Sequence, residues 1–192
     1  MKNLTNLIFV LLMVFQFTAC KSEKKEKTKT TKVENKSSAA FVLNDANNSV
    51  EWIAYKTTEK VPVKGKFTKV EVTSGGEGNS VKEAINMAEF SIPISSIFTS
   101  DSSRDYKIRK FFFGVMENTK LLSGKLVIEN DSLGFADITM NGITEKLPFT
   151  YTIEDKTFSM STKMDVLNWN AKSSLDSLNL ICKELHKGLD GI

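Results

Sequence analysis

From about Phe41 onward, hydrophobic and polar residues alternate in short runs along the chain. Alternation with a period of two predicts half-buried β-strands, and β-branched and aromatic residues favour extended structure. The runs cover residues 49–55, 62–67, 89–95, 124–129, 135–140, 147–153 and 158–166. Clusters of Gly, Asn and Asp separate several of them, and residues 141–146 are expected to connect a hairpin. About seven short strands with few helices between them predict an all-β, antiparallel barrel or sandwich.

Two residues within these runs predict local irregularities. Gly65 stands inside the run 62–67, where a glycine marks a bend or a close approach of the backbone to another group. Pro93 stands inside the run 89–95, and because proline lacks an N–H it favours an edge strand or an irregular pairing.

The stretch from Ile97 to Glu117 departs from the alternation. Ser and Asp residues near its start are candidates to begin a helix, and Ile108 and Phe111 or Phe112 recur at helical spacing. A short amphipathic helical turn is therefore predicted between two strands. The three consecutive phenylalanines of residues 111–113 cannot share one face, so at least one ring faces a second environment, either core or an apolar cavity.

A helix is predicted from Ser173 to Lys187. Its apolar stripe, which indicates a buried structural cysteine, consists of Leu175, Leu178, Cys182 and Leu185. Cys182 and His186 are four residues apart, so a nucleophile and base pair on this helix is the alternative interpretation.

The first 19 residues predict a secretory signal peptide. Lys2 precedes an apolar run from Leu7 to Phe15, which is too short to span a bilayer comfortably. Small residues stand just before Cys20, an arrangement that resembles the lipobox of bacterial lipoproteins, although Phe17 departs from its usual aliphatic residue. Cys20 is therefore the predicted lipidation site, and more than one acyl chain would anchor the protein stably to the membrane. A soluble secreted protein with a free Cys20 is the alternative.

Residues 20–40 predict a disordered tether, because they contain almost no large apolar side chains. The segment from Lys21 to Lys36 holds seven lysines and three glutamates, and the signal peptide adds one lysine. Removing these five positive charges from the whole-chain net charge of +3 leaves about −2 for residues 41–192. A domain without an excess of positive charge does not attract a phosphate backbone, so nucleic acid is excluded as a partner.

The supply of chemically active side chains is small. With Cys20 acylated, one cysteine and one histidine remain, which leaves no disulfide, no metal-ligand set and no cysteine pair for redox chemistry. No nucleophile elbow, paired-carboxylate motif or Gly-rich phosphate loop is present. We therefore expect no catalytic residues, no metal and no cofactor. An enzyme would need an acid-base pair, for which the sequence offers His186 together with Asp105 or Glu184.

Three segments in order resemble the YceI-like domain family, whose members are lipocalin-like barrels of the bacterial envelope. They are SVEWIAYK followed by GKF, then FSIPISSIFTSDSSRDYKIRKFFF, and then ITMNGITEKLPFTY. The resemblance implies a lipocalin-like antiparallel β-barrel with one C-terminal helix and a short helical loop. It also implies an envelope location and a long-chain polyisoprenoid or similar lipid inside the barrel. In this family the chain usually continues past the equivalent of residues 188–191 into a closing strand. Here we expect either a shortened domain or a helix at 173–187 that covers an open edge.

An eight-stranded barrel has an interior that holds one small ligand, and apolar alternation lines it. The candidate ligand-binding residues are Trp52, Phe67, Phe90, Ile92, Ile94, Phe111, Phe112, Met140, Phe149, Met160 and Met164. The same periodicity is equally compatible with a dry core, because it reports burial alone. Arg104 and Asp105 match a charged pair of the family, which fixes the loop through a salt bridge or meets a polar end group of the ligand.

The sequence thus predicts a membrane-anchored envelope lipoprotein, on the periplasmic or outer-membrane face, that binds a long-chain lipid or isoprenoid as a carrier or sensor. The alternative is an envelope lipoprotein with a solid core that binds a protein partner through its exterior or a sheet edge. An exposed edge would also allow a homodimer by strand addition.

Overall fold

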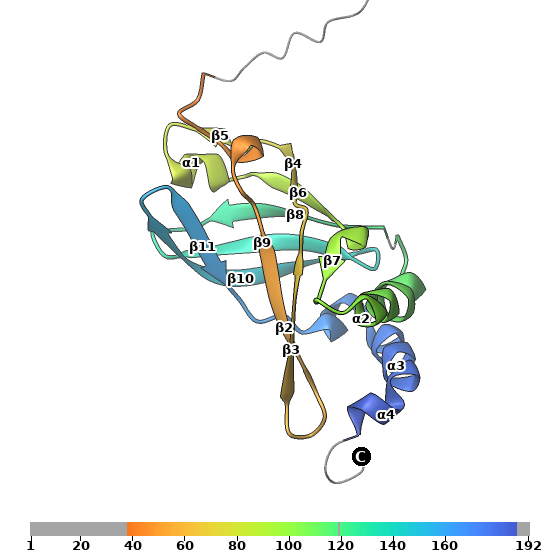
Figure 1. Ribbon diagram of the computed structural model, residues 1–192. Helices are drawn as coiled ribbons and strands as arrows, with labels where there is room; N and C mark the ends of the chain where they lie inside the picture. Colours follow the sequence, from red (N-terminus) through yellow and green to blue (C-terminus); the bar gives the residue numbers. More distant parts are fainter. Residues whose placement is uncertain (1–37, 119, 188–192) are drawn as a thin grey trace, which may run out of the picture. The chain divides into compact units, whose positions relative to one another are not determined.

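The computed structural model describes residues 38–118 and 120–187, which belong to one compact unit (Figure 1). The predicted signal peptide, the lipidation site at Cys20 and most of the predicted tether lie outside these residues. The first described strand, β1 (Phe41–Val42), pairs with the short strand β5 (Glu77–Gly78), and the short 3₁₀-helix η1 (Leu43–Asp45) follows β1.

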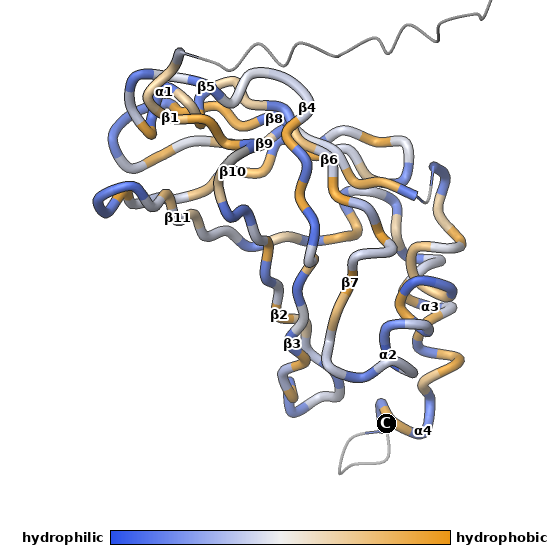
Figure 2. The backbone as a smooth tube through the Cα atoms, turned by 45° about the horizontal axis from the view of Figure 1, so that its top comes forward, coloured by the Kyte–Doolittle hydropathy of each residue, from blue (hydrophilic) through white to orange (hydrophobic). Residues whose placement is uncertain are grey.

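Six antiparallel strands form the main sheet: β4 (Glu71–Ser74), β6 (Glu89–Pro93), β8 (Leu121–Ile128), β9 (Leu133–Met140), β10 (Ile143–Glu154) and β11 (Thr157–Ser161). Their spatial order is β11–β10–β9–β8–β6–β4, and the sheet curls into a half-barrel (Figure 1). Figure 2 shows hydrophilic and hydrophobic residues following one another along the strands. The predicted antiparallel, mostly β fold is confirmed.

A second sheet contains β2 (Val50–Lys56), β3 (Val61–Phe67) and β7 (Ile97–Phe98), in the order β2–β3–β7. Trp52 lies opposite Gly65 in the ladder between β2 and β3. The 3₁₀-helix η2 (Ile94–Ser96) connects β6 to β7, so the run predicted as a strand to Ser95 ends at Pro93. β7 pairs with β3, which takes the chain from the main sheet to the second sheet.

The hairpin between β9 and β10 differs from the expected loop. Its turn is Asn141 and Gly142, with φ angles of 52° and 72°, and β10 begins directly at Ile143. An Asn-Gly pair with two positive φ angles matches the right-handed twist of the flanking strands. The prediction that residues 141–146 form the connection was therefore wrong, because the last four of them belong to β10.

The strand predicted for residues 158–166 was also too long, since β11 ends at Ser161. Ser161 pairs with Thr150, so two residues farther along the ladder would reach Pro148. The Pro148 carbonyl faces the β11 side, where it accepts a hydrogen bond of 2.6 Å from Thr162 Oγ1. The backbone nitrogen of Pro148 faces the same side but carries no hydrogen to donate to β11, so the ladder between β10 and β11 ends before this residue.

The helix α1 (Val81–Ile85) was not predicted. Ser80 caps it by accepting a hydrogen bond from the Glu83 N–H, and the Glu83 carboxylate accepts one from the Asn79 N–H at 2.8 Å. Ser80 and Glu83, three residues apart, match the capping-box signature in the sequence, although Glu83 bonds the N–H of Asn79 and not that of Ser80 itself. α1 packs against both β8 and β11 and therefore lies across one end of the main sheet.

The stretch from Ile97 to Glu117 contains the predicted helical turn. It forms α2 (Ser102–Lys107), the π-helix η3 (Ile108–Phe112) and the 3₁₀-helix η4 (Phe113–Val115). Phe112 and Phe113 are both buried, and their rings meet edge to face with centroids 4.9 Å apart. Phe111 points elsewhere and meets the Tyr106 ring, which confirms that one of the three rings faces a second environment.

After β11 the chain forms the 3₁₀-helix η5 (Val166–Trp169), then α3 (Lys172–Ile181) and α4 (Lys183–His186). The predicted helix is thus two helices that meet at Cys182. α3 packs mainly against η3 and η4, so the expectation that this helix covers an open sheet edge was wrong. Cys182 is buried as predicted, whereas Leu185 of the predicted stripe is 58% exposed because α4 extends past the core.

Candidate functional site

The inner face of the main sheet, as named here, is the face that carries Met140 and Phe149. Cross-strand partners point to the same face of a sheet. The pairs Met140 with Ile143, Ala136 with Leu147 and Gly134 with Phe149 therefore define this face on β9 and β10. The same register, extended through the other strands, adds Val72, Phe90, Ile92, Leu122, Leu126, Ile128, Ile138, Tyr151, Ile153, Phe158 and Met160.

One end of the inner face is covered by the helical segments. Phe112, Phe113 and Met116 pack with Ile92 and Met140 in one buried cluster, together with Phe67, Ile94, Ile97, Trp169 and Ala171. Trp169 is fully buried, and its indole N–H donates a 2.9 Å hydrogen bond to the Ile138 carbonyl. This bond fixes η5 against β9. We refer to this group as the packed end.

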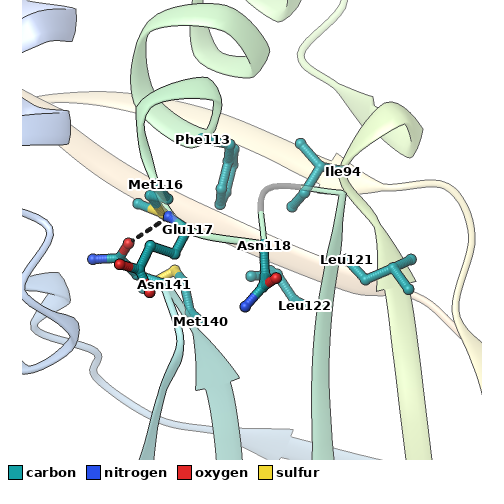
Figure 3. Close-up of a pocket in the computed structure, with 9 residues that line it drawn as sticks. All are labelled: Ile94, Phe113, Met116, Glu117, Asn118, Leu121, Leu122, Met140 and Asn141. Atoms are coloured by element: carbon teal, nitrogen blue, oxygen red, sulfur yellow. Dashed lines mark hydrogen bonds between the residues drawn. The ribbon is translucent and has the colours of Figure 1, made fainter.

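A small cavity remains at the packed end, lined by residues that include Ile94, Phe113, Met116, Leu122 and Met140 (Figure 3). Asn141 closes one side, where its Oδ1 accepts a 2.8 Å hydrogen bond from the Glu117 N–H. The volume of this cavity is about 10 Å³, which is close to the least that one water molecule needs. The cavity is therefore too small for an apolar chain.

The other end of the inner face is built from aromatic side chains of β10 and β11. The Phe149, Tyr151 and Phe158 rings lie with centroids 5.2 to 6.2 Å apart, and Tyr151 donates its hydroxyl to the Asn130 carbonyl at 2.5 Å. Beside these rings, Ile153 is 37% exposed and Met160 is 39% exposed. We refer to this region as the open end, because apolar side chains of the inner face reach solvent there.

The structure brings most of the predicted ligand-binding residues to the inner face or to the packed end. Phe90, Ile92, Met140, Phe149 and Met160 share the inner face. The residues that reach the packed end from other segments are Trp52, Phe67, Ile94 and Phe112. Two residues lie apart: Phe111 packs on Tyr106, and Met164 lies beyond the end of β11 and is 42% exposed.

Of the inner-face residues that were not predicted candidates, four matter most for the site: Glu145, Tyr151, Ile153 and Phe158. Tyr151, Ile153 and Phe158 stand at alternating positions within predicted strands, so the same period-two pattern was the available signal. Glu145 was hidden by its assignment to the hairpin loop. The Asn-Gly pair at 141–142 was the signal that would have placed it on a strand.

A larger hollow lies toward the opposite face of the main sheet. Its volume is about 440 Å³, and Leu133, Pro148, Thr150 and Ser161 line part of it. Their register places these four side chains on the face opposite to Phe149. Its walls also include Glu129 and Lys163, together with Gly134 and Phe149 of the inner-face register, so the hollow is lined by both apolar and charged residues.

Arg104 and Asp105, the charged pair near the start of α2, do not form a salt bridge with each other. The Asp105 carboxylate is buried and accepts hydrogen bonds from the Thr99 N–H at 2.9 Å and the Thr99 hydroxyl at 2.6 Å. Arg104 pairs with Asp101 at 3.7 Å instead. The hydrogen bond from the Arg104 backbone N–H lowers the pKa of Asp101, which caps α2. The expected salt bridge between Arg104 and Asp105 was wrong, although Asp105 does fix the loop.

His186 does not bond to Cys182 through its side chain. Its Nδ1 lies 2.9 Å from Asn179 Oδ1, and no hydrogen bond joins its ring to Asp105 or Glu184. Burial lowers the pKa of His186, and the nearby charges of Lys56 and Lys107 lower it further. The structure therefore forms neither the nucleophile and base pair of Cys182 and His186 nor the acid-base pair of His186 with Asp105 or Glu184.

Within residues 38–118 and 120–187, no group of three or more His, Cys, Asp or Glu side chains is placed to hold a metal ion. The helices in the same part of the chain are all too short or too polar to cross a membrane.

A protein-family model for the YceI-like domain matches residues 32–185. The chain belongs to the YceI-like domain family. The match includes every strand of the two larger sheets described above. No curated protein matches the sequence.

Two solved structures resemble this YceI-like chain. One is a polyisoprenoid binding domain from Saccharophagus degradans implicated in plant cell wall breakdown, with a TM-score of 0.55 and 12% identity over 76% of this chain and 88% of that chain. The other is a mutant of a YceI protein designated CJ with a monobromobimane guest, with a TM-score of 0.45 and 16% identity over 62% of this chain and 76% of that chain. The first supports the lipocalin-like antiparallel fold.

Proposed function

We propose that this YceI-like protein binds a long-chain apolar ligand of the polyisoprenoid type along the inner face of its half-barrel. The observation that carries the proposal is the open end of the inner face, where Ile153 and Met160 are exposed beside three aromatic rings. Exposed apolar residues that lie together are typical of a binding surface, and the register places Ile153, Phe158 and Met160 side by side on the inner face. The polyisoprenoid named for the Saccharophagus degradans domain gives the ligand class.

The shape of the site also suits a chain-like ligand. The packed end holds almost no free volume, whereas the open end exposes Ile153 and Met160 on adjacent strands beside the half-buried Phe158. Methionine adapts to irregular apolar surfaces, and aromatic rings provide large contact areas. A flexible hydrocarbon would therefore lie along β10 and β11 and end against the packed cluster.

Anchoring and location are part of the proposal. We infer that Cys20 carries the lipid anchor, that residues 21–40 form a tether, and that the protein is held at a membrane of the bacterial envelope. The sequence before Cys20 and the composition of the tether support this arrangement. A tethered binding domain suits a carrier or sensor that takes up lipid near the membrane surface. We assign no enzymatic activity to it.

A second candidate function is an interaction lipoprotein with a solid core. Within the described residues, strands β4 and β11 end the main sheet without a further partner on their outer sides. The small volume of the cavity at the packed end, about 10 Å³, also agrees with a solid core. An unpaired edge can add a strand from another protein or from a second copy of the chain.

Native mass spectrometry of residues 21–192, secreted from a bacterial host without the lipid anchor, separates the two functions. The lipid-binding function predicts a stoichiometric apolar molecule that travels with the protein and is released by organic extraction. The interaction function predicts a protein that is free of lipid and that cross-links to a partner through β4 or β11. A stable, empty protein would overturn the lipid-binding function.

A further inference from the structure

Glu145 is the single charged side chain on the inner face of the main sheet, across the strands that the structure describes. The other charged residues of these strands are Glu71, Glu89, Lys125, Asp137, Lys146 and Glu154, and the register places them all on the opposite face. Glu145 lies on β10 directly opposite Ile138. Its carboxylate is therefore surrounded by a face that is otherwise apolar apart from the Tyr151 hydroxyl.

The immediate neighbours of Glu145 on this face are apolar. Ile143 and Leu147 lie two residues to either side, and both pack against the buried cluster of the packed end, as does Ile138. Ile138 also packs against the aromatic cluster of Phe149 and Tyr151. Glu145 thus lies at the junction between the packed end and the open end.

No hydrogen bond or ion pair joins the Glu145 side chain to another residue of the described chain. Its side chain is half-buried, whereas the flanking outward residues Thr144 and Lys146 are exposed. A carboxylate on an apolar surface costs free energy unless a partner satisfies it. Glu154 lies on the same strand but on the opposite face. Its side chain is exposed, so its carboxylate stays in contact with water.

We propose that Glu145 selects the polar group of the bound ligand, an inference that rests on the proposed lipid-binding function. A carboxylate accepts hydrogen bonds and repels anions. The ligand is therefore a long apolar chain that carries a hydrogen-bond donor, either a hydroxyl or an ammonium group, and a chain that ends in a phosphate or diphosphate is rejected.

The test compares three probes with the same C20 isoprenoid chain: geranylgeraniol, geranylgeranylamine and geranylgeranyl diphosphate. Each displaces the neutral fluorescent probe N-phenyl-1-naphthylamine from residues 21–192 of the wild type, E145Q, E145L and the control E154Q. The wild type and E154Q are expected to bind the alcohol and the amine at least about tenfold more tightly than the diphosphate. In E145Q this preference falls by about tenfold, and the amine loses more affinity than the alcohol, because its ammonium group no longer faces a carboxylate.

E145L gives a second measurement that does not depend on the ligand. Because leucine removes an unpartnered charge from an apolar face, its melting temperature is expected to rise while its affinity for the alcohol falls. Equal affinities of wild type and E145Q for all three probes, or tightest binding of the diphosphate by the wild type, would overturn the role of Glu145 and leave the lipid-binding function intact. Failure of every apolar probe to bind the wild type would overturn both.

Discussion

Trp52 lies across from Gly65 on the neighbouring strand, and its indole ring occupies the space that a side chain at position 65 would need. A Cβ atom at Gly65 would lie 2.6 Å from Trp52 Cε2 and 2.9 Å from Thr99 Cγ2, both well inside van der Waals contact. The ring therefore reaches the packed end only because residue 65 has no side chain.

Replacing Gly65 with Ala is expected to destabilise the protein by about 1–3 kcal/mol, because the indole must leave its position or the strands must separate. Urea denaturation monitored by circular dichroism measures the change. The double variant G65A/W52L provides the control: removing the ring should recover much of the loss and give a non-additive cycle. Additive effects of the two substitutions would mean that the ring and the backbone do not compete for this space.

Met160 allows ligand binding to be separated from folding. It lies on the inner face of β11 and is 39% exposed, so M160D places a charge at the open end without emptying the core. Its melting temperature should stay close to that of the wild type, whereas the co-purified apolar ligand should be lost. S159D is the matched control, since Ser159 is the preceding residue and lies on the opposite face. Loss of ligand from both variants would argue against binding on the inner face.

Asn141 joins three segments through its side chain. Its Oδ1 accepts from the Glu117 N–H at 2.8 Å, and its Nδ2 donates to the Trp169 carbonyl at 2.8 Å. N141D keeps the acceptor and sets an oxygen against the Trp169 carbonyl, so a loss of about 1–3 kcal/mol is expected in chemical denaturation. Asn118 has the same φ of 52° and is exposed, so N118D is the control and should change stability by less than about 0.5 kcal/mol. Equal losses would exclude a special role for Asn141.

His186 gives the stability a pH dependence near neutrality. Its pKa is lowered in the folded protein by burial and by Lys56 and Lys107, whereas in the unfolded chain it is close to 6.5. The unfolded chain therefore binds more protons as the pH falls through about 6.5, and the free energy of unfolding decreases.

Because His186 is the one histidine of the sequence, H186Q should flatten the decrease in stability between pH 7.5 and pH 5.5. Urea denaturation at both pH values measures the slope, and the wild type serves as the reference. An unchanged slope in H186Q would assign the dependence to the carboxylates instead.

The faces of the strands could be predicted from the sequence, because the period of two does not depend on which strands pair. Phe90, Met140, Phe149 and Met160 were each predicted to point inward, and the register places them on one face of four different strands. The close approach at Gly65 was likewise readable from a single glycine inside a strand pattern.

The limits of prediction came from interactions that are distant in the sequence or that depend on a turn. The separation of β2, β3 and β7 into their own sheet is decided by long-range pairing, which periodicity does not report. β11 is short because Pro148, on the neighbouring strand, cannot donate to it. Glu145 was not predicted as a site residue because the Asn-Gly turn was not recognised in the sequence. Four residues of β10 were therefore assigned to a loop.

The most direct measurement of the central claim is photo-cross-linking of a diazirine-labelled isoprenoid alcohol to residues 21–192, with the modified peptides located by mass spectrometry. Binding along the inner face predicts adducts on Ile153, Phe158 and Met160. Adducts confined to Thr150, Ser161 and Lys163 would place the ligand in the hollow toward the opposite face, and the absence of saturable labelling would contradict lipid binding altogether.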